Sequence, residues 1–172
     1  KLSEALYQSH NLDIVCLMPT NIYGINDNFD KFSGHVIPGM INKINEAKIL
    51  KKKTVKLLGT GKPIREFLFA DDLAESIVLI LKKSKKQISQ ACKRKFPLIN
   101  VGSGISLSIK KLSKKIIKLL NYNGKAIFDS RYPDGTMKKS LDSKIMRSMG
   151  WKPKTSLEEG LRKSIKHYIN KK

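Results

Sequence analysis

Short apolar segments alternate with amphipathic segments along this chain, and that alternation constrains its fold more than any other feature. The segments "LDIVCLMP" at 12–19 and "FPLINVGSG" at 96–104 are apolar runs that end in turn residues. Such runs are typical of strands buried in a parallel sheet. Residues 36–49 and 108–121 instead carry apolar side chains at helical spacing. The sequence therefore predicts the α/β class.

Capping residues predict where the other helices begin. Pro38 suits the first turn of the 36–49 helix, and Asp71 or Asp72 can cap a helix that follows an extended piece. Ser156 and Glu159 form a capping box before the last helix. Further strands are expected within 51–63 and at 125–129, further helices at 1–10 and within 140–151, and a charged, exposed insertion at 82–95.

Several classes of protein are disfavoured by the sequence. The longest apolar run without a charge, 76–81, is far shorter than the roughly 20 residues that a membrane-spanning helix needs. Cys16 and Cys92 form neither a disulfide framework nor a metal-ligand cluster. We therefore expect no membrane partner, no metal and a reducing, cytoplasmic compartment. Because Lys1 stands inside a helical pattern, we also expect a fragment that begins in the middle of a helix.

The net charge of +21 points toward a polyanionic partner such as nucleic acid. The kind of basic residue weakens that interpretation, since only five of the 35 basic residues are Arg. Many lysines occupy the polar faces of predicted helices, where a solvated face is the ordinary explanation. A codon bias toward A and T produces the same lysine-rich composition. We expect no specific nucleic-acid partner.

The loop after the 12–19 strand is the first candidate site. In an open parallel sheet, ligands bind beyond the carboxyl ends of the strands, so Pro19, Thr20, Asn21 and Ile22 lie where a cofactor would pass. The alternative is a turn stiffened by Pro19 and hydrogen-bonded by Asn21. His35, later in the loop, is suited to proton transfer at neutral pH. Its alternative role is a structural hydrogen bond at a helix N-terminus.

Two further residues are candidates for binding a ligand. Arg65 is a fork-shaped donor in a chain that otherwise uses Lys almost everywhere, although it could instead pair with Glu66 or Asp71. Asp134 offers a carboxylate that can accept hydrogen bonds from a ligand. Its alternative is a turn residue within "YPDGT".

Four blocks in this order resemble the GDP-L-fucose synthase family: "PTNIYG", "NDNF" followed by "SGHVIP", "GTGKPIREFLFADDLA", and "PDGTMKKSLD". The likeness covers practically the whole chain. It implies the C-terminal part of an extended short-chain dehydrogenase/reductase fold, Rossmann-like, with a small α/β substrate-binding domain. Residues 1–172 would be one portion of a single domain whose N-terminal dinucleotide-binding half, with the catalytic Tyr and Lys, is absent. The fragment alone is therefore expected to be inactive.

The resemblance also implies a reaction: NADPH-dependent epimerisation and reduction of GDP-4-keto-6-deoxy-D-mannose by an enzyme that is commonly a homodimer. Pro19, Thr20, Asn21 and Ile22 would face the nicotinamide end of NADP. His35 would contact the cofactor and serve as the catalytic acid/base with a Cys that the chain lacks.

The same resemblance places substrate-binding residues along the chain. Arg65 would grip the diphosphate and Asp134 the guanine base. Lys43 stands where the family often has Arg, and Leu58 where it commonly has a stacking Trp. Two other functions remain open: another nucleotide-sugar epimerase or reductase on the same scaffold, and a basic, non-catalytic module that binds a polyanion.

Overall fold

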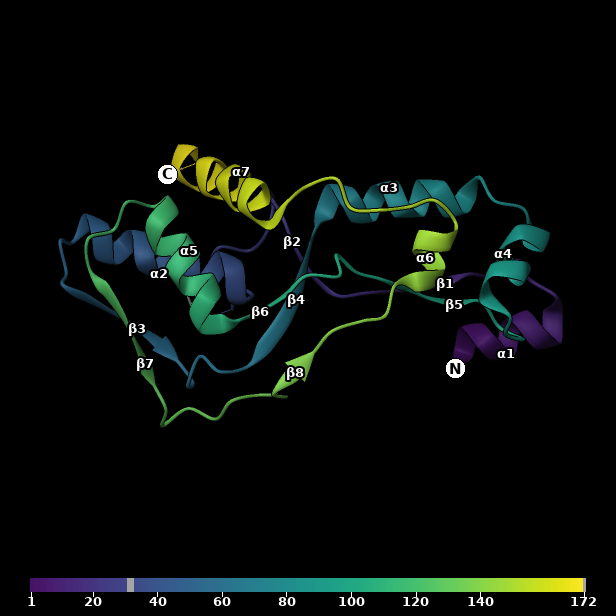
Figure 1. Cartoon of the computed structure of the whole chain (residues 1–172), viewed down its shortest axis with the longest axis horizontal. Coiled ribbons are helices and arrows are strands. Elements are labelled where there is room, and N and C mark those ends of the chain that lie inside the picture. Colours follow the sequence, from purple (N-terminus) through teal and green to yellow (C-terminus); the bar gives the residue numbers. More distant parts are fainter. Residues whose placement is uncertain (31–32, 172) are drawn as a thin grey trace.

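Three small sheets organise the computed structural model, which describes residues 1–30 and 33–171 (Figure 1). The first joins β1 (Cys16–Pro19) in parallel to β5 (Leu98–Val101), and another joins β3 (Thr54–Leu58) in parallel to β7 (Lys125–Asp129). Between them, β4 (Ile64–Phe69) lies parallel to β2 (Asn21–Tyr23) and β8 (Lys138–Lys139), and antiparallel to β6 (Ser106–Ser108). The helices are α1 (Leu2–His10), α2 (Val36–Ile49), α3 (Ala70–Leu81), α4 (Lys85–Cys92), α5 (Ile109–Leu119), α6 (Lys144–Ser148) and α7 (Leu157–Asn170).

Two hydrophobic cores form on opposite sides of the central strands. α2, α5 and α7 bury apolar side chains together with β3 and β7 in the first core, at one end of the molecule in Figure 1. β1, β5, α3, α4 and α6 supply the second core, at the other end.

The strand β4 connects the two cores through its alternating side chains. Phe67 and Phe69 belong to the first core, whereas Leu68 belongs to the second. Successive side chains of a strand point to opposite faces, so one short strand can be buried on both sides. The same alternation places Tyr23 of β2 in the first core and Ile22 against the second. The cleft described below opens beside these two strands.

A buried carboxylate ties several loops to β4. Glu66 is 1% exposed, and its Oε1 and Oε2 accept hydrogen bonds from the backbone N–H groups of Gly104 (2.7 Å) and Leu141 (2.9 Å). A Cβ at Gly102 would collide with Oε1 of Glu66, so only glycine allows this close approach. The turn after β5 is therefore shaped by a side chain of β4.

Most predicted elements are present, and the α/β class is confirmed. The helix over 36–49 has Pro38 in its first turn, the strand at 125–129 is confirmed, and the helix near 140–151 ends before Gly150, whose φ is +92°. Ser108 and Ser156 each cap a helix by accepting a backbone N–H three residues later.

Some local predictions are wrong. Residues 82–95 are not a simple exposed insertion, because α4 forms there and buries Ile88 and Cys92 in the second core. Neither Asp71 nor Asp72 caps α3, whose N-cap is Phe69.

The carboxylate of Asp72 instead accepts the backbone N–H groups of Lys154 (2.9 Å) and Thr155 (3.1 Å), segments far away in sequence. The Ser156 capping box is half formed, since the carboxylate of Glu159 pairs with Lys163. Both carboxylates find partners that sequence spacing alone does not indicate.

The strand predicted from "LDIVCLMP" is shorter and less buried than its composition suggests. Cys16 and Leu17 are half-buried, while Met18 is 50% exposed. Among the described residues β1 belongs to a sheet of only two strands, so little protein surrounds it. Asn21 and Ile22 do not lie in a loop, because they begin β2 directly after Thr20.

Within 1–30 and 33–171, none of the helices has both the length and the apolar character needed to cross a bilayer.

Candidate functional site

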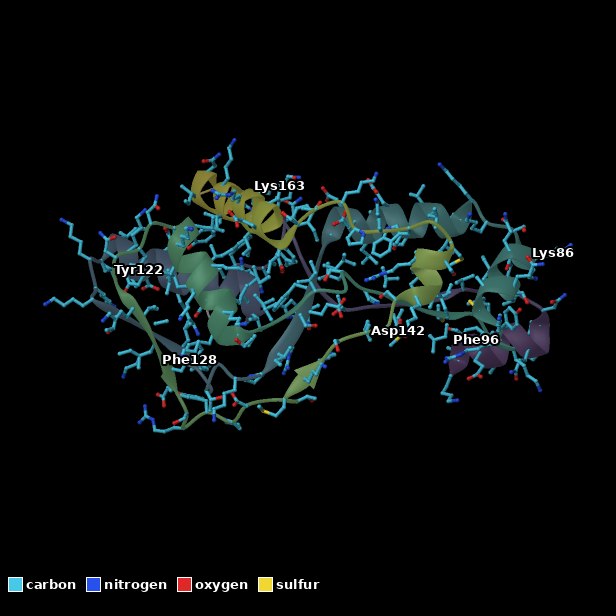
Figure 2. The ribbon with its side chains drawn as sticks, viewed as in Figure 1. Lys86, Phe96, Tyr122, Phe128, Asp142 and Lys163 are labelled. Carbon is cyan, nitrogen blue, oxygen red and sulfur yellow. The ribbon has the colours of Figure 1, made fainter. Side chains whose placement is uncertain are left out.

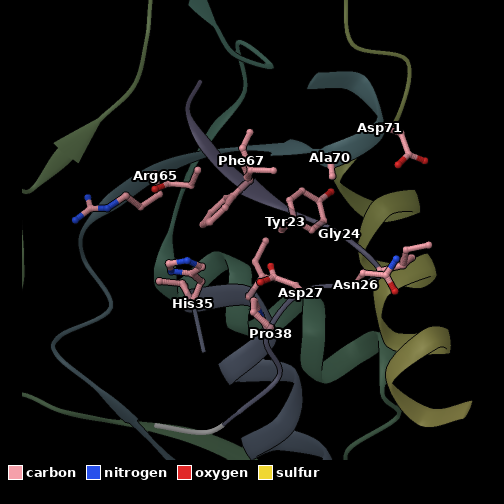
Figure 3. Close-up of a pocket in the computed structure, with 15 residues that line it drawn as sticks. Tyr23, Gly24, Asn26, Asp27, His35, Pro38, Arg65, Phe67, Ala70 and Asp71 are labelled. Carbon is pink, nitrogen blue, oxygen red and sulfur yellow. The ribbon is translucent and has the colours of Figure 1, made fainter. Parts of the chain in front are cut away.

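Two adjoining pockets line the N-terminal end of α2. The larger pocket, of about 540 Å³, lies between this end of α2, β2 and β4 (Figure 3). The smaller pocket, of about 360 Å³, extends from α2 toward the ends of β3 and β7. His35, Val36 and Arg65 line both pockets. The two pockets are therefore adjacent, with His35 and Arg65 between them, and we refer to them together as the cleft.

His35 occupies the N-cap position of α2. Its backbone is extended, at φ −62° and ψ 172°, and its imidazole makes no capping hydrogen bond to the helix. Figure 3 shows the ring facing the pocket, on the opposite side from Phe67 and Arg65. The structural alternative for His35, a hydrogen bond at the helix N-terminus, is thus not what the geometry shows. The ring is exposed and positioned to reach a bound molecule.

Arg65 lies in β4, and its side chain reaches into the cleft at the junction of the two pockets. Its Nη1 donates to the carbonyl of Ile64 at 2.8 Å. A Cβ built on Gly135 would lie 3.5 Å from Nη2, so the guanidinium is beside the 133–135 turn. The alternative ion pair with Glu66 does not form, because Glu66 points away into its buried backbone contacts.

Asp134 is held by one residue of the turn after β3. Its Oδ1 accepts the backbone N–H of Thr60 at 2.9 Å, and its Oδ2 accepts the Thr60 hydroxyl. Gly59, at φ +80°, brings the turn directly against the carboxylate. The Thr60 hydrogen bonds, first that of the side chain, hold the pKa of Asp134 below its usual value. Asp134 is therefore an ionised acceptor at neutral pH, and more than a local turn residue.

The other two predicted substrate residues line the same pocket. Lys43, on α2, lines the smaller pocket. Leu58, the last residue of β3, lines it as well and is 54% exposed. Lys43, Leu58, Arg65 and Asp134 come from four separate segments, and the fold brings all of them to one pocket. Such convergence is what a binding site requires and what a set of unrelated surface residues lacks.

The predicted cofactor residues divide into two groups. Asn21 and Ile22 line the larger pocket, whereas Pro19 and Thr20 line neither pocket. Thr20 is buried, and its hydroxyl donates to the carbonyl of Glu66 at 3.0 Å; the amide of Asn21 donates to the same carbonyl at 2.8 Å. These polar groups fix the path of β2 beside β4, which agrees with the structural alternative for Asn21.

Several lining residues were not predicted from the sequence. Asp27 lies at the pocket beside Pro38, and Tyr23 and Phe67 form its apolar wall (Figure 3). Burial, together with the carboxylates of Asp72 and Glu159, raises the pKa of the Tyr23 hydroxyl far above its usual range. This hydroxyl remains protonated and donates to the carbonyl of Leu157 at 3.4 Å, so Tyr23 is a wall and not a base. The sequence signal that could have indicated them is their position inside the "PTNIYG", "NDNF" and "REF" segments.

In the part of the chain that the structure describes, no three or more His, Cys, Asp or Glu side chains gather in a position to hold a metal ion.

Comparisons with known proteins identify the family of the chain. The profile of the NAD dependent epimerase/dehydratase family matches residues 1–98, which is more than half of the chain. The chain belongs to this family. Its α/β fold with parallel strands is the one that the family resemblance implies.

The chain is also similar to individual named proteins. The probable GDP-L-fucose synthase 1 of Oryza sativa subsp. japonica is 38% identical over 169 residues, which cover 98% of this chain and 49% of the rice protein. The solved GDP-6-OMe-4-keto-L-xylo-heptose reductase from C. jejuni has a TM-score of 0.89 at 27% identity, covering 99% of this chain and 58% of that chain. A GDP-L-fucose synthetase from Naegleria fowleri bound to NADP has a TM-score of 0.76 at 25% identity, and the match covers 91% of this chain and 46% of that chain.

The chain spans about half the length of the curated relatives it matches. The described residues fit one end of the dinucleotide that the family name implies. Tyr23 and Phe67 supply apolar walls for a flat ring in the larger pocket, which Asn21 and Ile22 also line. The glycines of the 102–104 turn do not indicate a second ligand site. Gly102 packs against Glu66, and Gly104 packs against Arg147.

Proposed function

We propose that residues 1–172 form the substrate-binding portion of an NADP(H)-dependent GDP-L-fucose synthase, which converts GDP-4-keto-6-deoxy-D-mannose to GDP-L-fucose. The observation that carries this proposal is the convergence of Lys43, Leu58, Arg65 and Asp134 on one pocket that shares His35 with a second. The nucleotide would occupy the smaller pocket and the sugar would reach the larger one. The likeness to proteins named GDP-L-fucose synthase supports this choice of substrate.

The smaller pocket has the groups that a guanosine diphosphate needs. Arg65 and Lys43 bring two positive charges for the diphosphate, and Arg65 alone can make paired hydrogen bonds to it. Leu58 offers an apolar surface to the base or ribose. A carboxylate has about four acceptor positions, so Asp134 can bind the N1–H and amine of guanine while it keeps its Thr60 hydrogen bonds.

His35 is proposed as the acid/base at the sugar. Its exposed imidazole faces the larger pocket at the junction with the diphosphate site, where the hexose of a bound nucleotide sugar would lie. It would move protons at the two carbons that flank the keto group, which is the chemistry of epimerisation. A bound dinucleotide would supply the hydride that reduces the keto group, and Asn21 and Ile22 would position its nicotinamide end.

Assembly and compartment follow from the same proposal. We expect a homodimer, as is common for enzymes of this kind, and a reducing cytoplasm. Cys16 and Cys92 are both free in the structure, which is consistent with a reducing compartment. Another nucleotide-sugar epimerase or reductase remains the closest alternative function, and nucleotide selectivity separates the two.

Calorimetry with the 172-residue chain tests the nucleotide assignment, because every proposed GDP contact lies within it. GDP should bind more tightly than UDP or ADP. Asp134→Ala should remove most of that preference, and the matched control Asp142→Ala, an exposed carboxylate that lines neither pocket, should leave it unchanged. Equal affinities of the wild-type chain for the three nucleotides would contradict the guanine assignment.

A further inference from the structure

Lysines make up half of the lining of a third hollow, at the far end of the first core. It has a volume of about 610 Å³ and lies between the turn that joins α2 to β3 and the turn that joins α5 to β7. Figure 2 shows Tyr122 at this end of the molecule and Phe128 further along β7. Five of its ten lining residues are lysines, and none is acidic: Lys48, Lys51, Lys52, Lys53 and Lys125. We refer to it as the lysine hollow.

The lysine hollow is distinct from the nucleotide pocket. Thr54, the first residue of β3, lines the hollow, whereas Leu58, the last residue, lines the smaller pocket of the cleft. Four residue steps along a strand correspond to roughly 13 Å. A ligand in the hollow therefore contacts the opposite end of the β3–β7 sheet from a bound nucleotide.

The positive charges of the hollow are not neutralised within the described residues. No ion pair joins any of its five lysines to a carboxylate in that part of the chain, although ion pairs form elsewhere, as between Lys154 and Glu75 at 2.8 Å. The helix dipole favours a positive charge in the last turn of a helix, which explains the position of Lys48 in α2 but not that of the other four lysines. Lys52, Lys53 and Lys125 follow the helices or begin strands, so their clustering needs another account.

Hydrogen bonds hold the two lysine-bearing turns in place. The buried Tyr122 hydroxyl donates to the carbonyl of Lys52 at 3.0 Å, and the N–H of Lys125 donates to the carbonyl of Lys53, also at 3.0 Å. These bonds fix the backbone that carries three of the lysines. Only the side chains remain to be ordered by a ligand, which lowers the entropic cost of binding.

We propose that the lysine hollow binds a short condensed phosphate chain, with tripolyphosphate as its simplest form. Five exposed lysines lining one open hollow match a compact ligand with several negative charges better than they match a neutral one. Nucleic acid fits less well, since the aromatic ring at the site, Tyr122, is 6% exposed and cannot stack on a base. The concave shape also favours a compact anion over an extended strand.

Calorimetry with tripolyphosphate at 150 mM salt tests the proposal. Replacing Lys52, Lys53 and Lys125 together with Gln should weaken binding about tenfold or more, since each exposed ammonium contributes a modest share. The control changes Lys82, Lys85 and Lys86 to Gln, which removes the same charge from exposed lysines that line none of the described pockets. Its affinity should fall less than twofold. Melting temperatures should match wild type in both variants, because all six side chains are exposed.

Four outcomes would overturn the proposal. Equal losses in the two variants would assign the binding to net charge, and absence of binding at 150 mM salt would remove the site. Competition by GDP would place tripolyphosphate in the nucleotide pocket. If an RNA homopolymer alone depended on Lys52, Lys53 and Lys125, the hollow would be part of a nucleic-acid surface and not a phosphate-chain site.

Discussion

Replacing Glu66 with Gln tests whether one buried carboxylate holds the loops around β4. The two oxygens of Glu66 accept backbone N–H groups from Gly104 and Leu141, and the side chain is 1% exposed. A glutamine retains one carbonyl acceptor, but its NH₂ group must face one of these N–H donors. One hydrogen bond to a charged group is lost, and two buried donors then oppose each other.

The magnitude follows from these contacts. A hydrogen bond to a charged group contributes roughly 1.5–3 kcal/mol, and a buried donor without an acceptor costs roughly 1–3 kcal/mol more. Removing the buried charge returns part of its desolvation cost. We expect the free energy of unfolding to fall by about 3 kcal/mol, which corresponds to a melting temperature about 6–12 °C lower for a chain of this size.

Thermal and urea unfolding measure this loss. The control is Glu75→Gln, which removes an exposed carboxylate that pairs with Lys154 at 2.8 Å and should cost less than about 1 kcal/mol. If Glu66→Gln is no less stable than Glu75→Gln, the desolvation cost of Glu66 outweighs its hydrogen bonds. The argument that this residue organises the 102–104 turn would then be wrong.

The remaining predictions concern the cleft. Arg65→Lys should weaken GDP binding by roughly 1.5–3 kcal/mol in calorimetry, because an ammonium cannot make the paired contacts of a guanidinium, while Arg162→Lys on α7 should have no effect. In a hybrid that joins this chain to the N-terminal half of the rice relative, His35→Asn should keep GDP binding but lower solvent deuterium exchange beside the keto group by roughly 10²–10⁴-fold; wild-type exchange with a lowered melting temperature would make His35 structural. Thr60→Val should destabilise the chain at neutral pH and less so in acid: the lowered pKa of Asp134 means that its contribution is present above the unfolded value and is lost as pH falls through the folded one. Melting curves from pH 2.5 to 7 measure this, and a stability difference from wild type that is independent of pH would exclude Asp134 as its source.

The sequence by itself determined the class of the fold and the identity of most candidate residues. Helical spacing and caps are local properties, so the helix over 36–49 and the serine caps of α5 and α7 were predictable. The four blocks of the family resemblance likewise lie within short segments. From them followed His35, Arg65 and Asp134 as candidates, before any contact between them was visible.

Tertiary structure decided how these residues are used. Spacing could not reveal that Asp72 accepts N–H groups from residues 154 and 155, or that Thr60 holds Asp134 across 74 positions of the chain. Polar side chains take whichever partner the fold brings near, and distant segments meet only after folding. The burial of α4 also depends on packing, because an amphipathic, lysine-rich segment is exposed or half-buried according to what lies beneath it. Local pattern thus predicts elements, whereas the pairing of buried polar groups is a property of the folded chain alone.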